Sequence, residues 1–79
     1  MFFVYVLRCN DASYYVGSTQ DLGERIEIHN SGKGPTFTAS RRPVELIYSE
    51  EFATLEEAVG RERQLKGWSR AKKEGPNQR

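Results

Sequence analysis

Few of the features that stabilise very small proteins or anchor membrane proteins occur in this sequence of 79 residues. Its one cysteine, Cys9, cannot form an intrachain disulfide, and with one histidine, His29, there is no thiolate and imidazole set for zinc. The longest apolar run after the initial methionine, residues 2–7, has six residues, whereas a membrane-spanning helix needs about 20. No basic segment precedes this run, as it would in a signal peptide. We therefore predict a reduced, single-domain, cytoplasmic protein without a membrane partner.

Strong charge of one sign is also absent. The net charge is +1, from 12 Lys and Arg against 11 Asp and Glu, and 37% of the residues are hydrophobic, as in a globular domain. The charge is nevertheless uneven, because residues 61–79 carry seven basic and two acidic side chains. A basic segment is compatible with nucleic-acid binding, but a solvated helix face explains it equally well.

Three segments have the composition of β-strands. The unbroken apolar run at residues 2–7 predicts a central strand that is covered on both faces. Turn-forming residues at 9–13 separate it from a second strand at 14–19, which completes a hairpin. A third strand is expected within residues 44–52, where Val44, Leu46 and Tyr48 alternate with Glu45, Ile47 and Ser49.

Capping residues predict the helices. Asp21, with Glu24 three positions later, opens a helix that ends near residue 30, before a polar loop at residues 31–43. Thr54 opens a second helix that reaches about Gly67, and Ser69 caps a further short helix to residue 73. The expected fold is α+β, a small three-stranded antiparallel sheet flanked by helices in the order β-β-α-β-α with a short final helix. We expect the domain to span residues 1–75, with a disordered tail at 76–79.

One carboxylate falls on the apolar face of the second long helix. Four residues at helical spacing define that face: Leu55, Ala58, Val59 and Leu65. Glu62 lies on the same stripe, where a carboxylate loses hydration unless it is paired, and a perturbed acid in a cleft is a candidate functional group. The structural alternative is an ion pair with a neighbouring base, namely Arg61, Arg63 or Lys66.

The first helix carries a second unusual pair. Arg25 and His29 are four positions apart on the border of its apolar face, so both can point at whatever lies over the sheet. A guanidinium and an imidazole together suit a phosphate or a carboxylate. The alternatives are an ion pair of Arg25 with Asp21 or Glu24, and a histidine with a structural role only.

Two tyrosines lie on the strands of the predicted hairpin. Tyr5 and Tyr15 face each other or nearly so, and their strand propensity is the simpler explanation for their presence. Beside an arginine–histidine pair and a buried glutamate, however, they outline a phosphodiester site. In such a site Arg25 balances phosphate charge, Glu62 holds a hard metal ion, and a phenol moves a proton.

The order of these residues resembles the GIY-YIG nuclease superfamily, and within it the small stand-alone bacterial proteins. Residues 3–5 (Phe-Val-Tyr) and 15–17 (Tyr-Val-Gly) stand where its two signature triplets do, and Gly17 would let the backbone approach closely. Residues 21–30 resemble its first-helix motif. Residues 32–34 and 41–46 resemble its loop and third strand, and residues 62–73 its C-terminal helices. The resemblance covers residues 1 to about 73.

This resemblance implies a metal-dependent endonuclease that hydrolyses DNA phosphodiester bonds, in repair or recombination. Tyr5 would be the general base or its partner, and Tyr15 would position or activate the nucleophile. Arg25 would stabilise charge on the scissile phosphate, and His29 would assist the tyrosines or contact phosphate. Glu62 would be the only protein ligand of one divalent ion, Mg²⁺ or Mn²⁺, because Mg²⁺ keeps most of its waters.

Four positions depart from the family pattern. Phe3 replaces the glycine of the first triplet, and Gly23 and Glu24 stand where relatives often carry charged residues, commonly a second arginine next to Arg25. Phe37 occupies a position where a tyrosine is expected, so one hydroxyl contact is lost. None of these departures alters the expected catalytic set.

Nucleic-acid binding is expected to use basic residues outside that set: Lys33, Arg41, Arg42, Lys66, Arg70, Lys72 and Lys73. Family members usually gain specificity from an attached DNA-binding domain. We therefore expect a nuclease that tolerates different DNA structures, including branched DNA, or one directed by a protein partner. Two alternatives stay open, a nucleic-acid-binding module that does not cut and a protein-interaction domain on the same fold. Glu62→Gln separates the nuclease from the binding module that does not cut, because with this substitution a nuclease loses cutting and keeps binding.

Overall fold

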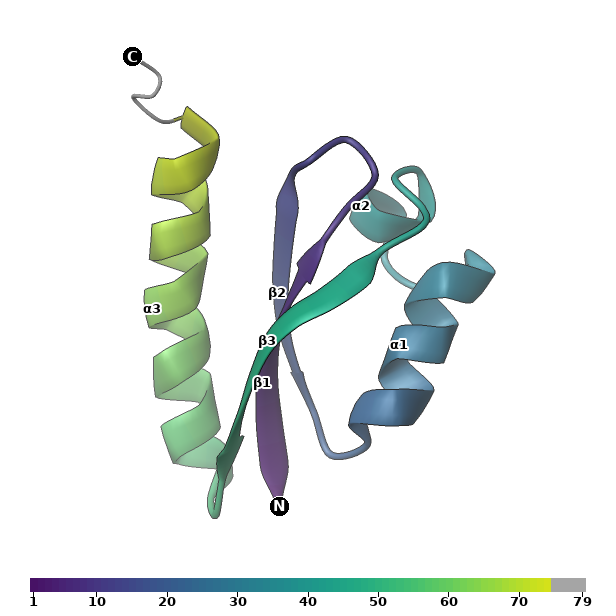
Figure 1. Ribbon diagram of the computed structural model, residues 1–79. Coiled ribbons are helices and arrows are strands. Elements are labelled where there is room, and N and C mark those ends of the chain that lie inside the picture. Colours follow the sequence, from purple (N-terminus) through teal and green to yellow (C-terminus); the bar gives the residue numbers. More distant parts are fainter. Residues whose placement is uncertain (75–79) are drawn as a thin grey trace.

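The computed structural model describes residues 1–74, and the side chains of residues 1–70; the predicted tail at 76–79 lies outside the described residues. The strands β1 (Phe2–Arg8), β2 (Tyr14–Thr19) and β3 (Glu45–Phe52) form one sheet. Helices α1 (Leu22–Ser31) and α2 (Thr36–Ala39) cover one face, and α3 (Leu55–Glu74) covers the other (Figure 1). The predicted α+β class and element order are confirmed.

The sheet is antiparallel with the strand order β2-β1-β3, so the apolar run forms the central strand as predicted. In the β1–β2 register Tyr5 is opposite Gly17, and Leu7 is opposite Tyr15. Side chains alternate along a strand, so the two tyrosines lie on the same face of the sheet, offset by two positions. Tyr5 therefore lies over the glycine of the second triplet.

The third strand is an exposed edge rather than a regular half-buried one. Val6 is paired with Tyr48 and Leu7 with Leu46, so Ile47 is an extra residue in a β-bulge. The bulge interrupts the alternation expected from the sequence, and Ile47 is 44% exposed and Tyr48 40% exposed. The outer edge of β3 has no strand partner within residues 1–74.

The two faces of the sheet bury separate apolar clusters. Against α3, the buried residues are Val4, Val6, Val16 and Ala58. Against α1 and α2, they are Tyr5, Leu7, Cys9 and Val44. The central strand contributes to both clusters, which explains why it is apolar at successive positions. The second cluster contains Tyr5, and the buried polar residue His29 lies next to it.

The helices differ from the sequence-based expectation in two places. The predicted break near Gly67 is wrong, because α3 runs without interruption from Leu55 to Glu74. Gly67 lowers helix propensity without forcing an end, and Ser69 donates to the Lys66 carbonyl instead of capping a new helix. The one-turn helix α2 within the expected loop was not predicted. Its first turn has no side-chain cap that the sequence would reveal.

Helix α1 begins and ends as predicted. The Asp21 carboxylate accepts a hydrogen bond from the Glu24 amide, and Gly32 ends the helix in the left-handed conformation with φ of 86°. Thr54 caps α3 by accepting from the Glu57 amide at 3.3 Å. Along residues 1–74 no helix combines the length and apolarity needed to cross a membrane.

Candidate active site

Tyr5 is the point at which the expected site residues meet. Its side chain projects from β1 toward α1 and is 1% exposed. Its ring centroid is 6.4 Å from that of Tyr15 and 5.8 Å from that of His29, and the Tyr15 and His29 rings are 5.1 Å apart. Two strands and one helix therefore bring together three residues that lie up to 24 positions apart in the chain.

A chain of hydrogen bonds fixes the proton positions around His29. The Thr38 hydroxyl donates to the Pro35 carbonyl oxygen at 3.2 Å, which uses its only proton. With this donation, Thr38 accepts from Nδ1–H of His29, which lies 2.8 Å away, and the Nδ1–H tautomer is the one assigned here. Nε2 of this neutral ring is then an acceptor, and the Tyr5 hydroxyl donates to it at 3.0 Å. Within the described side chains, the Tyr5 hydroxyl has no hydrogen-bond partner besides His29.

Burial keeps both groups of this pair uncharged. It raises the pKa of Tyr5 to about 12, with Tyr15 and Glu62 adding to the increase and Arg25 opposing it. Burial also lowers the pKa of His29, and the positive charge of Arg25 lowers it further. At neutral pH the resting site thus holds a protonated phenol and a neutral imidazole. In this environment the phenol, and not the tyrosinate, is the favoured form of Tyr5 at neutral pH.

Arg25 is the cation whose charge acts on both members of this pair. It is half-buried on α1, and its charge influences the pKa of both Tyr5 and His29. The alternative ion pair with Asp21 or Glu24 does not form: among residues 1–74, its side chain has no hydrogen bond or ion pair. A half-buried guanidinium without an anionic partner is suited to a phosphate.

Gly17 provides the space that Tyr5 occupies. A Cβ atom at this position would lie 2.5 Å from the Tyr5 hydroxyl oxygen and 3.2 Å from a ring carbon of Tyr15. The buried phenol has no room to withdraw, so only glycine fits beneath it. The close approach of the backbone expected at Gly17 is found in the structure as a contact with the Tyr5 side chain.

Glu62 lies on the other side of β2 from His29. One carboxylate oxygen accepts from the Ser18 hydroxyl at 3.0 Å, and the other pairs with the Lys66 ammonium at 2.9 Å. The structural alternative of an ion pair with Lys66 is therefore realised, although the Glu62 side chain stays 19% exposed. Ser18 holds the carboxylate in place, and the Lys66 ammonium shows that a cation is stable at its outer oxygen.

These residues fit a single hard cation. The described residues contain no group of three or more His, Cys, Asp or Glu side chains able to hold a metal. One partly exposed carboxylate, already bonded to a cation, suits Mg²⁺ or Mn²⁺, since Mg²⁺ is commonly held by one or two carboxylates with waters and substrate phosphates.

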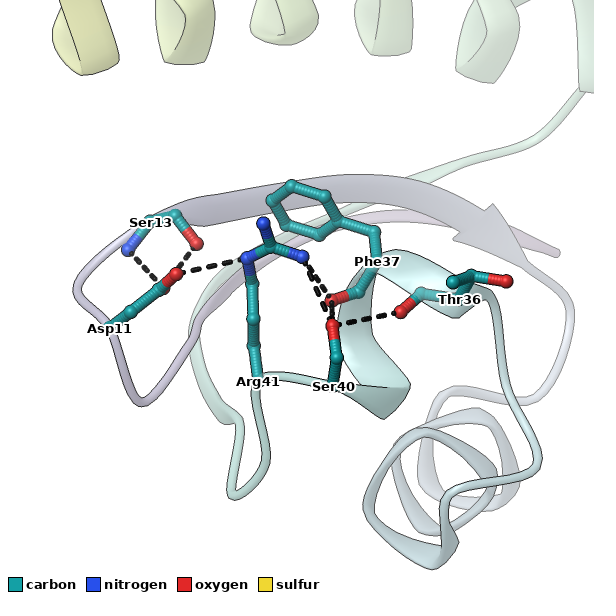
Figure 2. A network of polar contacts seen from close by, with 6 residues as sticks. All are labelled: Asp11, Ser13, Thr36, Phe37, Ser40 and Arg41. Atoms are coloured by element: carbon teal, nitrogen blue, oxygen red, sulfur yellow. Dashed lines mark hydrogen bonds and ion pairs between the residues drawn. The ribbon is translucent and has the colours of Figure 1, made fainter.

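Arg41 and Arg42 form intramolecular bonds in the structure. Figure 2 shows Arg41 donating to the Asp11 carboxylate at 2.9 Å and to the Phe37 carbonyl at 2.9 Å, with Ser40 as a further acceptor. Its guanidinium carbon also lies 4.0 Å from the centre of the Phe37 ring. Arg42 donates to the carbonyl oxygens of Ala39 and Asn30. Both side chains tie α2 to its neighbours, and their role in nucleic-acid binding stays a prediction.

The other basic residues expected to bind nucleic acid are spread over two elements. Lys33 is exposed in the loop between α1 and α2, and Arg70 is exposed on α3 one turn beyond Lys66. Lys72 and Lys73 continue α3, and their side chains lie outside the part that the structure describes. Lys66 and Arg70 line the same groove as Tyr15, whereas Lys33 does not.

Sequence reasoning missed two residues that hold the site in place. Thr38 is completely buried and fixes the His29 ring, and Ser18 fixes Glu62. The alternation of β2 gives a signal for Ser18, because it lies on the same face as the buried Val16. No local pattern marks Thr38, whose contact with His29 depends on how α2 folds back against α1.

Comparison with known proteins identifies a family and several relatives. The GIY-YIG catalytic domain family matches residues 1–75. The chain is 53% identical to the UPF0213 protein of Bacillus pumilus over 72 residues, which cover 91% of this chain and 74% of the relative. It is 46% identical to the UPF0213 protein of Staphylococcus epidermidis over 71 residues, covering 90% and 87% of the two chains. The solution NMR structure of a UPF0213 protein from Bacillus halodurans is similar at 44% identity, with a TM-score of 0.55, covering 94% of this chain and 80% of that one.

Proposed function

Since this chain belongs to the GIY-YIG nuclease family, we propose that it is a divalent-metal-dependent endonuclease that hydrolyses phosphodiester bonds of DNA. The observation that supports this most directly is the convergence on Tyr5. Its hydroxyl bonds to His29, its ring lies beside Tyr15, and its pKa responds to both Arg25 and Glu62. A role in repair or recombination is proposed at the level of the family alone.

The hydrogen-bond direction suggests how the proton of the attacking water is removed. A water molecule donates to the free lone pair of the Tyr5 oxygen while the Tyr5 proton moves to Nε2 of His29. Tyr5 is then a relay between water and imidazole, and a phenol with a pKa of about 12 never has to ionise in the resting enzyme. The neutral imidazole, held by Thr38, is the final proton acceptor.

Arg25 and Glu62 supply the charges that the reaction needs. The Arg25 guanidinium compensates the negative charge that develops on the phosphate oxygens. Glu62 would hold one Mg²⁺ or Mn²⁺, with Ser18 orienting the carboxylate. When bound, such an ion acts as a Lewis acid on the phosphate and lowers the pKa of its bound water.

The test is cleavage of DNA by the purified protein with Mn²⁺ or Mg²⁺, on nicked, branched, single-stranded and duplex substrates. Glu62→Gln should lower the rate by at least about 100-fold and leave DNA binding in place. Glu57→Gln, which removes the same charge from an exposed position on α3, is the control and should cut at the wild-type rate. If wild-type protein binds DNA but cuts none of these substrates, the non-catalytic binding module replaces the nuclease. If it does not bind DNA at low salt either, the protein-interaction domain is favoured.

A further inference from the structure

A groove of about 400 Å³ opens beside the candidate site at the outer edge of β2. Tyr14, Tyr15 and Phe37 contribute aromatic rings to its wall, and Lys66 and Arg70 of α3 contribute positive charge. The groove is continuous with the site, because Tyr15 lies 5.1 Å from the His29 ring and Lys66 is bonded to Glu62. A ligand in the groove is therefore adjacent to the reacting phosphate.

The edge of the sheet at this groove has no strand partner. Within residues 1–74, β2 pairs with β1 alone, so its outer backbone groups face the groove side of the molecule. An extended polymer can lie along such an edge, as a strand or a single-stranded nucleic acid does. The two cations favour a polymer that carries negative charge.

The chemistry of the lining distinguishes between paired and unpaired nucleotides. Aromatic rings beside cations form the surfaces on which unpaired bases stack, while the cations neutralise the backbone. A base within a duplex is already stacked on both faces and cannot enter a groove of this kind. Phe37 is fixed for this role by Arg41, whose guanidinium lies 4.0 Å from the ring centre and is anchored to Asp11 (Figure 2).

The low net charge disfavours a duplex further. The net charge is +1, and four of the described basic side chains are bonded within the protein: Arg41, Arg42, Arg61 and Lys66. Duplex affinity without base contacts grows with the number of phosphates neutralised, so it must be low here. Stacking adds affinity that a single strand can use and a duplex cannot.

We propose that this groove binds an unpaired nucleotide next to the scissile phosphate, and that the substrate is accordingly single-stranded or contains a gap or flap. The inference rests on the proposed nuclease function because it places the groove next to a phosphate that is cut. Binding in the groove can be tested without cleavage. DNA and RNA strands share the required chemistry, so both are included as probes.

The first measurement is binding of fluorescein-labelled DNA strands, RNA strands and duplexes of one sequence, by anisotropy, to the full chain in chelator and about 50 mM salt, where electrostatic binding is strong. We expect single strands to bind at least about tenfold more tightly than the duplex. Phe37→Leu should weaken single-strand binding by about tenfold, the effect of one lost base stack. Arg70→Gln should weaken it by about threefold and flatten the salt dependence.

Two control variants remove the same groups at the opposite edge of the sheet. There, a second groove of about 490 Å³ lies between β3 and α3, with Tyr48 and Arg61 in its lining and no residue of the candidate site. Tyr48→Leu and Arg61→Gln should leave single-strand binding unchanged. Equal affinity for strand and duplex, or equal loss from Phe37→Leu and Tyr48→Leu, overturns the inference. Amide spectra of each variant establish that it is folded.

Cleavage with Mn²⁺ then separates this inference from the proposed function. Faster cutting of single-stranded or gapped DNA than of intact duplex supports both. If intact duplex is cut as fast as single-stranded or gapped DNA, the proposed binding of an unpaired nucleotide is wrong, and the nuclease function is supported. Selective single-strand binding that depends on Phe37, without any cleavage, keeps the groove and rejects the nuclease.

Discussion

The Tyr5 hydroxyl and Nε2 of His29 lie 3.0 Å apart in the interior of the domain. The Thr38 hydroxyl lies 2.8 Å from the opposite nitrogen of the ring and also contacts the Pro35 carbonyl. If Thr38 donates to that carbonyl, it accepts from Nδ1–H and the phenol donates to Nε2. This direction matters, because the phenol oxygen can then accept a proton from water.

Thr38→Val should disturb the His29 tautomer. The substitution keeps the shape of the side chain but leaves Nδ1–H of His29 without a partner, while the Pro35 carbonyl still accepts from the Ala39 amide. The free energy of unfolding should therefore fall by about 2 kcal/mol. Nitrogen chemical shifts of the His29 ring should then report a mixture of tautomers in place of the Nδ1–H form. Thr38→Ser restores the hydroxyl and should restore the spectrum. A ring that keeps the same tautomer in the valine variant would contradict the assigned proton positions.

The stability of the protein should decline as the pH falls below about 6.5. Burial lowers the pKa of His29 below its ordinary value of 6.5, so at pH 7 the imidazole is neutral in both folded and unfolded chains. Below 6.5 the unfolded chain binds a proton that the folded chain resists, which favours unfolding. Urea midpoints between pH 7.5 and 5 measure this. The slope should disappear in His29→Gln, and an unchanged slope there would assign the effect to another group.

Gly17→Ala should displace Tyr5. The added Cβ meets the buried phenol at 2.5 Å, and we expect a loss of about 1–3 kcal/mol of stability, typical of overpacking. Gly60→Ala is the matched control, because a Cβ there has no neighbour within 4 Å on exposed α3. It should raise stability by about 0.5–1 kcal/mol through helix propensity. Equal effects of the two variants in thermal unfolding would show that Tyr5 can move aside.

Lys66→Met should strengthen metal binding at Glu62. The Lys66 ammonium bonds to the oxygen that a divalent ion would use, at 2.9 Å, so an ion has to displace it. Because the lysine is half-exposed, the competition is worth up to about 1 kcal/mol, or about fivefold in affinity. Broadening of amide signals near Glu62 by Mn²⁺ measures the change, and Glu62→Gln should abolish it. Weaker Mn²⁺ binding in Lys66→Met would contradict this competition and show that Lys66 favours metal binding.

Local sequence signals predicted most of the fold. The apolar run at residues 2–7, the turn after it, and the caps at Asp21 and Thr54 each act over a few residues, and each is found where expected. The end of α3 was misjudged, because Gly67 lowers helix propensity but does not stop a helix that packs against the sheet. Helix α2 was missed because its partners come from other elements, such as His29 of α1, whose ring nitrogen Nδ1 is hydrogen-bonded to Thr38.

The sequence by itself predicted which residues belong to the candidate site, since the order of Tyr5, Tyr15, Arg25, His29 and Glu62 resembles the GIY-YIG family, whose model matches residues 1–75. Only the tertiary structure decided which contacts those residues make. The direction of the Tyr5–His29 bond depends on Thr38, and the occupation of Glu62 depends on Ser18 and Lys66. The contacts of Arg41 with the Phe37 ring and the Asp11 carboxylate could not be predicted from the sequence either. Spacing fixes the face of an element on which a residue lies, whereas proton positions, burial and ion pairs depend on which elements pack together.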